Sequence, residues 1–247
     1  MKRKISVIIL SVLAVGIISY FPVKYIIGKN DVMLQWGNIL SKQTQNEKKG
    51  VSSFGDTNYK LTTKGINSQS VVSGEEIYEA GTDVLISKQE VEQAKEFYVL
   101  QGQSEKNAEK EAVKYMEEFN AMYVEAVNNG FDVTEQEVDD YISELQKMSE
   151  EAENADDVKK VIAQFESEDA YWEYQKTVCR KQLPIQKYVA VLEKNYLDKI
   201  EKDVADSDTT DLWNKELDKI KEKAAEKQKY KRVQSDKDIN KKFEVNN

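Results

Sequence analysis

The chain has 247 residues, with 45 acidic against 36 basic side chains, no histidine and one cysteine. An acidic surface repels phosphate backbones, which argues against a nucleic-acid partner, and the lack of histidine excludes Ser-His and Cys-His catalytic pairs and histidine-ligated metals. The single cysteine, Cys179, excludes an internal disulfide and a thiolate-cluster zinc site, and we expect it to lie in the core. Only two prolines and ten glycines interrupt the chain, so its composition predicts a mostly α fold.

The N-terminus carries a candidate membrane anchor. Three basic residues at positions 2–4 precede nineteen uncharged residues, Ile5–Val23, and a helix needs about 20 apolar residues to cross a bilayer. The basic residues predict that 1–4 are cytoplasmic, that 5–23 form one transmembrane helix, and that the bulk of the chain is extracytoplasmic at the cell membrane. A cleaved signal peptide is the alternative, but the small-x-small triplet at 14–16 lies inside the apolar run rather than after it.

Residues 24–76 are predicted to be a juxtamembrane segment followed by a spacer. The first half contains apolar residues, among them Trp36 and Leu40, that would suit an interfacial helix. Residues 50–75 are rich in Ser, Thr, Gly and Asn and show no helical period, as is typical of a linker. We expect ordered structure to begin at Ile77 with a short extended piece.

Capping signals predict where the helices of a domain spanning 77–204 begin. Ser87 with Glu90, and Thr134 with Glu137, match the S/T-x-x-E capping box, in which the side chains and backbone of a helix start exchange hydrogen bonds. Further helices are expected to begin near Ser104, Asp156 and Ser167.

The predicted helix ends rest on glycine and proline. Gly102 and Gly130 follow helical runs and can adopt the left-handed conformation that ends a helix. Pro184 removes a backbone hydrogen bond from the run that starts at Ser167, and should kink or break it. A last helix is predicted over 209–231, with a narrow apolar stripe that must dock on the 77–204 domain, and 232–247 are predicted to be a disordered tail.

The sequence contains none of the common catalytic signatures. Ser-x-x-Lys, the phosphate-binding G-x-x-x-x-G-K and the dinucleotide-binding G-x-G-x-x-G are absent. Adjacent acids such as Asp139 and Asp140 point about 100° apart on a helix, so they do not share a site. We therefore predict that the protein is not an enzyme and uses no cofactor or metal.

Flexible and amphipathic side chains offer a different kind of site. Methionine and aromatic residues are typical of surfaces that bind many peptides, although at helical spacing each of them more often belongs to a core. The sequence leaves open whether Phe131, just after Gly130, faces inward or toward a client. The candidate peptide-binding residues are Phe97, Tyr98, Met116, Phe119, Met122, Phe131, Met148, Tyr171 and Trp172.

Three stretches carry a family resemblance: ISKQEVEQA, EKEAVKYMEEFNAMYVEAVNNGFDVTEQEVDDYISEL and SEDAYWEYQKTVCRKQLPIQKYV. Their order, from Ile77 to Tyr196, resembles the N-terminal chaperone domain of the SurA and PrsA foldases. Those foldases carry a parvulin-type peptidyl-prolyl isomerase domain before a final helix, whereas here a short connector leads from Asp203 to Trp213. The resemblance therefore implies an irregular multi-helix, chaperone-type domain without isomerase activity.

Two hypotheses for function follow from these features. The first is a membrane-anchored extracytoplasmic protein, chaperone-like, that binds unfolded or newly secreted polypeptides without covalent chemistry. Its acidic stretch from Asp132 to Asp157 would keep a bound complex soluble. The alternative is a structural or adaptor module that binds one dedicated envelope protein.

Overall fold

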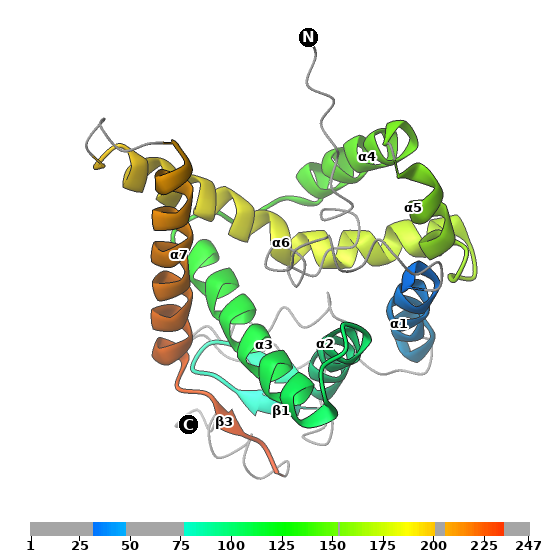
Figure 1. Ribbon diagram of the computed structural model, residues 1–247, viewed down its shortest axis with the longest axis horizontal. Helices are drawn as coiled ribbons and strands as arrows, with labels where there is room; N and C mark the ends of the chain where they lie inside the picture. Colours follow the sequence, from blue (N-terminus) through cyan, green and yellow to red (C-terminus); the bar gives the residue numbers. More distant parts are fainter. Residues whose placement is uncertain (1–31, 48–76, 153, 201–205, 235–247) are drawn as a thin grey trace, which may run out of the picture. The chain divides into compact units, whose positions relative to one another are not determined.

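The computed structural model describes residues 32–47, 77–152, 154–200 and 206–234 (Figure 1). Seven helices and three short strands occupy these ranges, so the prediction of a mostly α fold is confirmed. The helices are α1 (Val32–Glu47), α2 (Lys88–Leu100), α3 (Glu105–Asn128), α4 (Glu135–Glu151), α5 (Ala155–Ile162), α6 (Glu168–Leu197) and α7 (Asp206–Gln228). The strands are β1 (Ile77–Ala80), β2 (Leu85–Ser87) and β3 (Lys231–Arg232).

The predicted N-terminal anchor falls outside the part of the chain that the structure describes. This holds for residues 1–4, for the apolar run 5–23 and for 48–76 of the predicted spacer. Within the described ranges, no helix combines the length and apolar character needed to cross a membrane.

The described elements form two compact units. Unit 1 contains α1, α2, α4 and α5 with the first parts of α3 and α6, and unit 2 contains the three strands, α7 and the remaining parts of α3 and α6. The division passes between residues 115 and 116 in α3 and between 181 and 182 in α6. Two helices are therefore shared by both units.

Both predicted glycine stops end their helices. Gly130 has a φ of +84°, its N–H donates to the Val127 carbonyl, and the N–H of Phe131 donates to the Ala126 carbonyl. Gly102 has a φ of +92° and the same pair of bonds one helix earlier. These are the two bonds of a Schellman motif, which satisfies the last carbonyls of a helix.

The predicted capping box at the start of α4 is also present. Thr134 Oγ1 accepts from the N–H of Glu137 at 3.2 Å, and the Glu137 carboxylate accepts from the N–H of Thr134 at 2.8 Å. The two reciprocal bonds fix the residue at which α4 begins.

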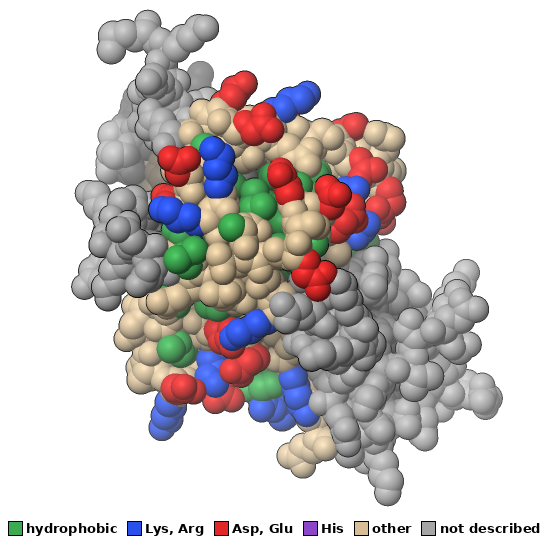
Figure 2. Space-filling view, turned by 90° about the vertical axis from the view of Figure 1, so that its right-hand side faces the viewer, with side chains coloured by type: hydrophobic (Ala, Val, Ile, Leu, Met, Phe, Trp, Pro, Cys, Tyr) green, Lys and Arg blue, Asp and Glu red, His purple; other side chains and the backbone are tan. Residues whose placement is uncertain are grey.

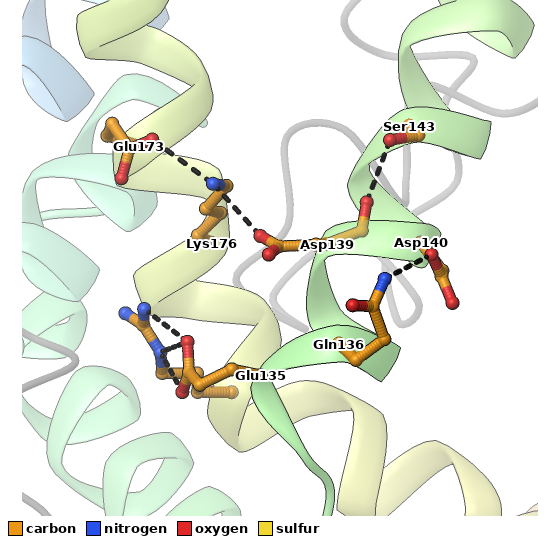
Figure 3. Close-up of polar contacts among 8 residues, drawn as sticks. Glu135, Gln136, Asp139, Asp140, Ser143, Glu173 and Lys176 are labelled. Atoms are coloured by element: carbon orange, nitrogen blue, oxygen red, sulfur yellow. Dashed lines mark hydrogen bonds and ion pairs between the residues drawn. The ribbon is translucent and has the colours of Figure 1, made fainter.

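Ion pairs join the first turns of α4 to α6 within unit 1 (Figure 3). Arg180 binds both carboxylate oxygens of Glu135, and Lys176 lies 2.9 Å from Asp139 and 3.2 Å from Glu173. The hydrogen bond from Arg180 holds the pKa of Glu135 below its usual value. Because these groups are largely exposed, the pairs orient α4 more than they stabilise it.

Helix α1 corrects the prediction that 24–76 is only a juxtamembrane segment and spacer. Trp36 and Leu40 are buried, and the Trp36 ring lies 5.0 Å from that of Phe97 on α2. Gly37 lies so close to α5 that a Cβ there would be 2.8 Å from the Val161 carbonyl oxygen. Apolar residues that suit a membrane interface suit a protein core equally well, and here α1 belongs to the core of unit 1.

Helix α6 continues through Pro184, so of the two outcomes predicted from the sequence, a kink or a break, the break does not occur. Proline removes the bond that its own N–H would make to the Arg180 carbonyl, but packing on both sides can compensate. Lys181 and Leu183 beside it are buried, so tertiary contacts hold this turn in place.

The three strands form a small antiparallel sheet in unit 2, in the order β2-β1-β3. The extended piece predicted from Ile77 corresponds to β1 and β2. The last helix ends at Gln228 rather than at 231, and Lys231 and Arg232 form β3 instead of opening a disordered tail. Val233 is buried with Ile77, and residues 235–247 lie outside the described ranges.

Candidate polypeptide-binding surface

Most of the predicted peptide-binding residues lie in the interior. Seven of the nine are buried, and their contacts are those of a core: Tyr171 packs edge-on against Phe165, and Met122 packs with Ala121 and Ala224. In this structure they are not accessible to a client. The buried seven are Phe97, Tyr98, Met116, Phe119, Met122, Tyr171 and Trp172.

The remaining two, Met148 and Phe131, are half-buried. Met148 lies on α4 in unit 1, and Phe131 follows the end of α3 in unit 2, so they belong to different units. Phe131 contacts a second half-buried ring, that of Tyr188.

Phe131 is presented by the glycine stop of α3. The left-handed Gly130 turns the chain away from the helix axis, and the bond from the Phe131 N–H to Ala126 fixes the residue that follows. The Phe131 ring lies 5.4 Å from that of Tyr188 on α6, with an angle of 46° between the ring planes. A tilted pair at this distance is a favourable aromatic contact.

Val191 extends this apolar surface along α6. It lies three residues after Tyr188 and therefore on the same side of the helix, and it is 42% exposed. Phe131, Tyr188 and Val191 together are called the 131–191 surface below. It offers two half-buried rings and one exposed aliphatic side chain.

Tight packing beneath the 131–191 surface keeps it in place. Ala121 and Met122 of α3 and Ala224 of α7 form a buried cluster, against which Tyr188 and Val189 of α6 pack. Small residues let three helices approach closely, so Tyr188 lies on a closely packed base.

Charged groups flank this surface. Lys227 Nζ lies 2.8 Å from Glu125 Oε1. Burial, as the larger cause, and the charge of Glu125, as the smaller one, raise the pKa of Tyr188. Its hydroxyl is therefore protonated at neutral pH. One face of the molecule shows acidic and basic side chains interspersed, with apolar ones between them (Figure 2).

Cys179 is buried in α6, as predicted, and burial raises the pKa of its thiol to about 12. Because the thiolate is the reactive form, the folded chain should resist alkylation by iodoacetamide at pH 8. Mass spectrometry should show label only after denaturant is added. Rapid labelling of the native chain would contradict the burial of Cys179.

The sequence analysis missed two long-range interactions of acidic side chains. Glu90, taken as part of a capping box, forms a buried ion pair with Lys181. Burial and the charge of Glu117 on α3 raise the pKa of Glu79 on β1 to about 7. No local sequence pattern predicts either interaction, because the interacting residues lie far apart in the sequence.

Within the described ranges, no group of three or more acidic or cysteine side chains is placed to hold a metal ion. Comparison of the chain with protein family models, with curated proteins and with solved structures finds no match. The resemblance to the SurA and PrsA foldases therefore stays a prediction from the sequence.

Proposed function

We propose that the chain is an extracytoplasmic, chaperone-like protein that binds unfolded or newly secreted polypeptides without covalent chemistry, held at the membrane by residues 5–23. The observation that carries the binding role is the 131–191 surface, where aromatic and aliphatic side chains stay partly exposed beside a buried cluster of unit 2. Such surfaces bind short apolar segments through buried area rather than through chemistry.

This proposal differs from the sequence-based one in where the client binds. Phe131 is the one residue kept from the predicted set, and Tyr188 and Val191 are added. In the sequence, Tyr188 belonged to an apolar stripe with Val189 and Leu192, and spacing alone could not separate its exposed members from its buried ones.

The alternative proposal is an adaptor that binds one dedicated envelope protein. The small size of the 131–191 surface favours it, because three side chains suit one short segment better than a range of unfolded chains. The two proposals differ in how many partners the surface contacts.

Photo-crosslinking separates the two. A photoreactive residue at Val191 of the full chain, in membranes from the source cell, should capture many unrelated polypeptides if the protein is chaperone-like. One stoichiometric partner would instead support the adaptor. The same residue at exposed Glu144 of α4 is the control, and equal capture from both positions would contradict binding at the 131–191 surface.

Mutation of the surface should weaken binding. Exchanging Val191→Ser together with Phe131→Ser should lower affinity for a denatured client about tenfold or more, because each exchange removes apolar area from the contact. Binding can be measured by fluorescence anisotropy of a labelled client. Leu34→Ser is the matched control, since Leu34 of α1 is 37% exposed and lies in unit 1; an equal loss there would count against the assignment.

A further inference from the structure

The first turn of α1, in unit 1, leaves apolar side chains in contact with solvent. Val32 and Met33 are half-buried, and Leu34 is 37% exposed. They are the first three residues of the helix, and its first turn contains no charged side chain. These three residues are called the 32–34 patch below.

The rest of α1 is divided between a core face and a polar face. Trp36 and Leu40 are buried, so the apolar residues from the middle of the helix are used by the core of unit 1. Among the α1 side chains that the structure describes, the other exposed ones are polar: Gln35, Asn38 and Lys42. Apolar exposure is therefore confined to the end of α1 that follows the proposed anchor.

An ion pair marks the opposite end of this polar face. Lys42 Nζ lies 2.8 Å from Glu96 Oε1 of α2, and the two side chains are 60% and 31% exposed. Charged groups this accessible belong in water. Lys42 follows Leu34 by eight residues, which is about 12 Å along a helix axis. The side chains of α1 thus change from apolar to charged over a distance that suits the boundary between lipid and water.

The sequence just before the patch has the composition of a membrane interface. Residues 24–31 contain Tyr25 and two isoleucines together with Lys24 and Lys29, and one acid. Tyrosine is enriched at the level of the lipid headgroups, and long basic side chains place their apolar stems in lipid and their charges in water. Only these eight residues separate Val23, the end of the proposed anchor, from Val32.

This short connection makes a small patch sufficient for binding to lipid. Three apolar side chains bury too little area to hold a free protein on a bilayer. When the chain is already attached a few residues away, the contact becomes intramolecular, and its effective concentration is high. The bilayer that holds the anchor is therefore favoured over a soluble partner or a second copy, neither of which gains from the connection.

We propose that the 32–34 patch inserts into the interfacial layer of the bilayer that carries the anchor, so that α1 begins at the lipid surface and its Lys42 end lies in water. The inference rests on the anchor of the proposed function, but not on client binding at the 131–191 surface. The ligand is the boundary between lipid headgroups and acyl chains, recognised by apolar contact. Anionic headgroups are not required, because the patch contains no basic side chain.

Fluorescence quenching by lipid tests the inference. The full chain with Leu34→Cys, labelled with bimane, is placed in phosphatidylcholine vesicles with and without brominated acyl chains. Cys179 should stay unlabelled because it is buried. Bromine should quench the label at position 34 several-fold more than a label at Glu144→Cys, which is exposed on α4 of the same unit. Phosphatidylglycerol added to the vesicles should not increase the difference.

A third position shows whether contact is confined to the start of α1. A label at Lys42→Cys should be quenched as little as the label at Glu144→Cys, although it lies on the same helix as Leu34. If Leu34→Cys does not fold, Gln35→Cys, the exposed neighbour in the first turn, gives the same comparison.

Flotation of the vesicles separates failure of this inference from failure of the anchor. A chain that floats with the vesicles but shows equal quenching at positions 34 and 144 would overturn the lipid contact and leave the anchor in place. A chain that does not float would overturn both. Neither result bears on client binding, which the anisotropy of a labelled client measures separately. Capture of a protein, but no lipid, by a photoreactive residue at position 35 would also overturn the inference.

Discussion

Replacing Lys181 with methionine should lower the free energy of unfolding by about 3–5 kcal/mol, because it leaves the Glu90 carboxylate buried without its cation. The side chains of Lys181 and Glu90 are 0% and 1% exposed, and Nζ lies 3.0 Å from Oε1. Removing one partner of a buried ion pair is among the most destabilising single substitutions, because the other charge stays buried without compensation. Urea denaturation followed by circular dichroism measures the change.

Two further variants test whether the unpaired Glu90 carboxylate causes the loss of stability. Glu90→Leu combined with Lys181→Met removes both charges and should recover most of the lost stability. Arg180→Met, at the adjacent residue, breaks an exposed pair with Glu135 and should cost at most about 1 kcal/mol. A double variant as unstable as Lys181→Met would show that lost packing, and not an unpaired carboxylate, causes the effect.

Trp36→Ala should destabilise unit 1 by about 3–5 kcal/mol, because it removes a large buried ring from the contact between α1 and α2. Trp36 is buried and its ring lies 5.0 Å from that of Phe97. The thermal unfolding midpoint, followed by circular dichroism, should fall by roughly 6–20 °C.

Leu34→Ala on the same helix is the control for this prediction. Leu34 is 37% exposed, so its truncation should cost less than about 1 kcal/mol. If α1 were a spacer, both substitutions would leave stability unchanged. Equally small losses of stability in both variants would therefore support the sequence-based prediction that this segment is a spacer.

Local chemistry explains why the helix boundaries could be predicted. A glycine that must adopt a positive φ, or a threonine and glutamate three residues apart, acts through hydrogen bonds within one turn. Gly102, Gly130 and Thr134 therefore end and begin helices where the sequence placed them.

Long-range contacts explain what could not be predicted. Trp36 and Phe97 meet only after the chain has folded, and so do Glu90 and Lys181. The same holds for β3, whose two residues gain their structure by pairing with a strand about 150 residues earlier.

The candidate site shows the same limit more sharply. Helical spacing placed Met116 and Tyr171 on apolar faces, but it could not tell which apolar faces would be covered by another helix. Both are buried, whereas Phe131 stays partly exposed because a glycine stop carries it beyond the end of α3. The exposed part of a stripe is decided by the arrangement of its neighbours.

The start of α1 at Val32 also limits how far the domain could reach from a bilayer. With the proposed anchor ending at Val23, only residues 24–31 remain between membrane and fold, and a fully extended chain covers at most about 3.6 Å per residue. The first helix of unit 1 would then stay within roughly 30 Å of the lipid surface. Residues 48–76, read from the sequence as a tether, would instead connect two parts of the folded protein and add nothing to its reach.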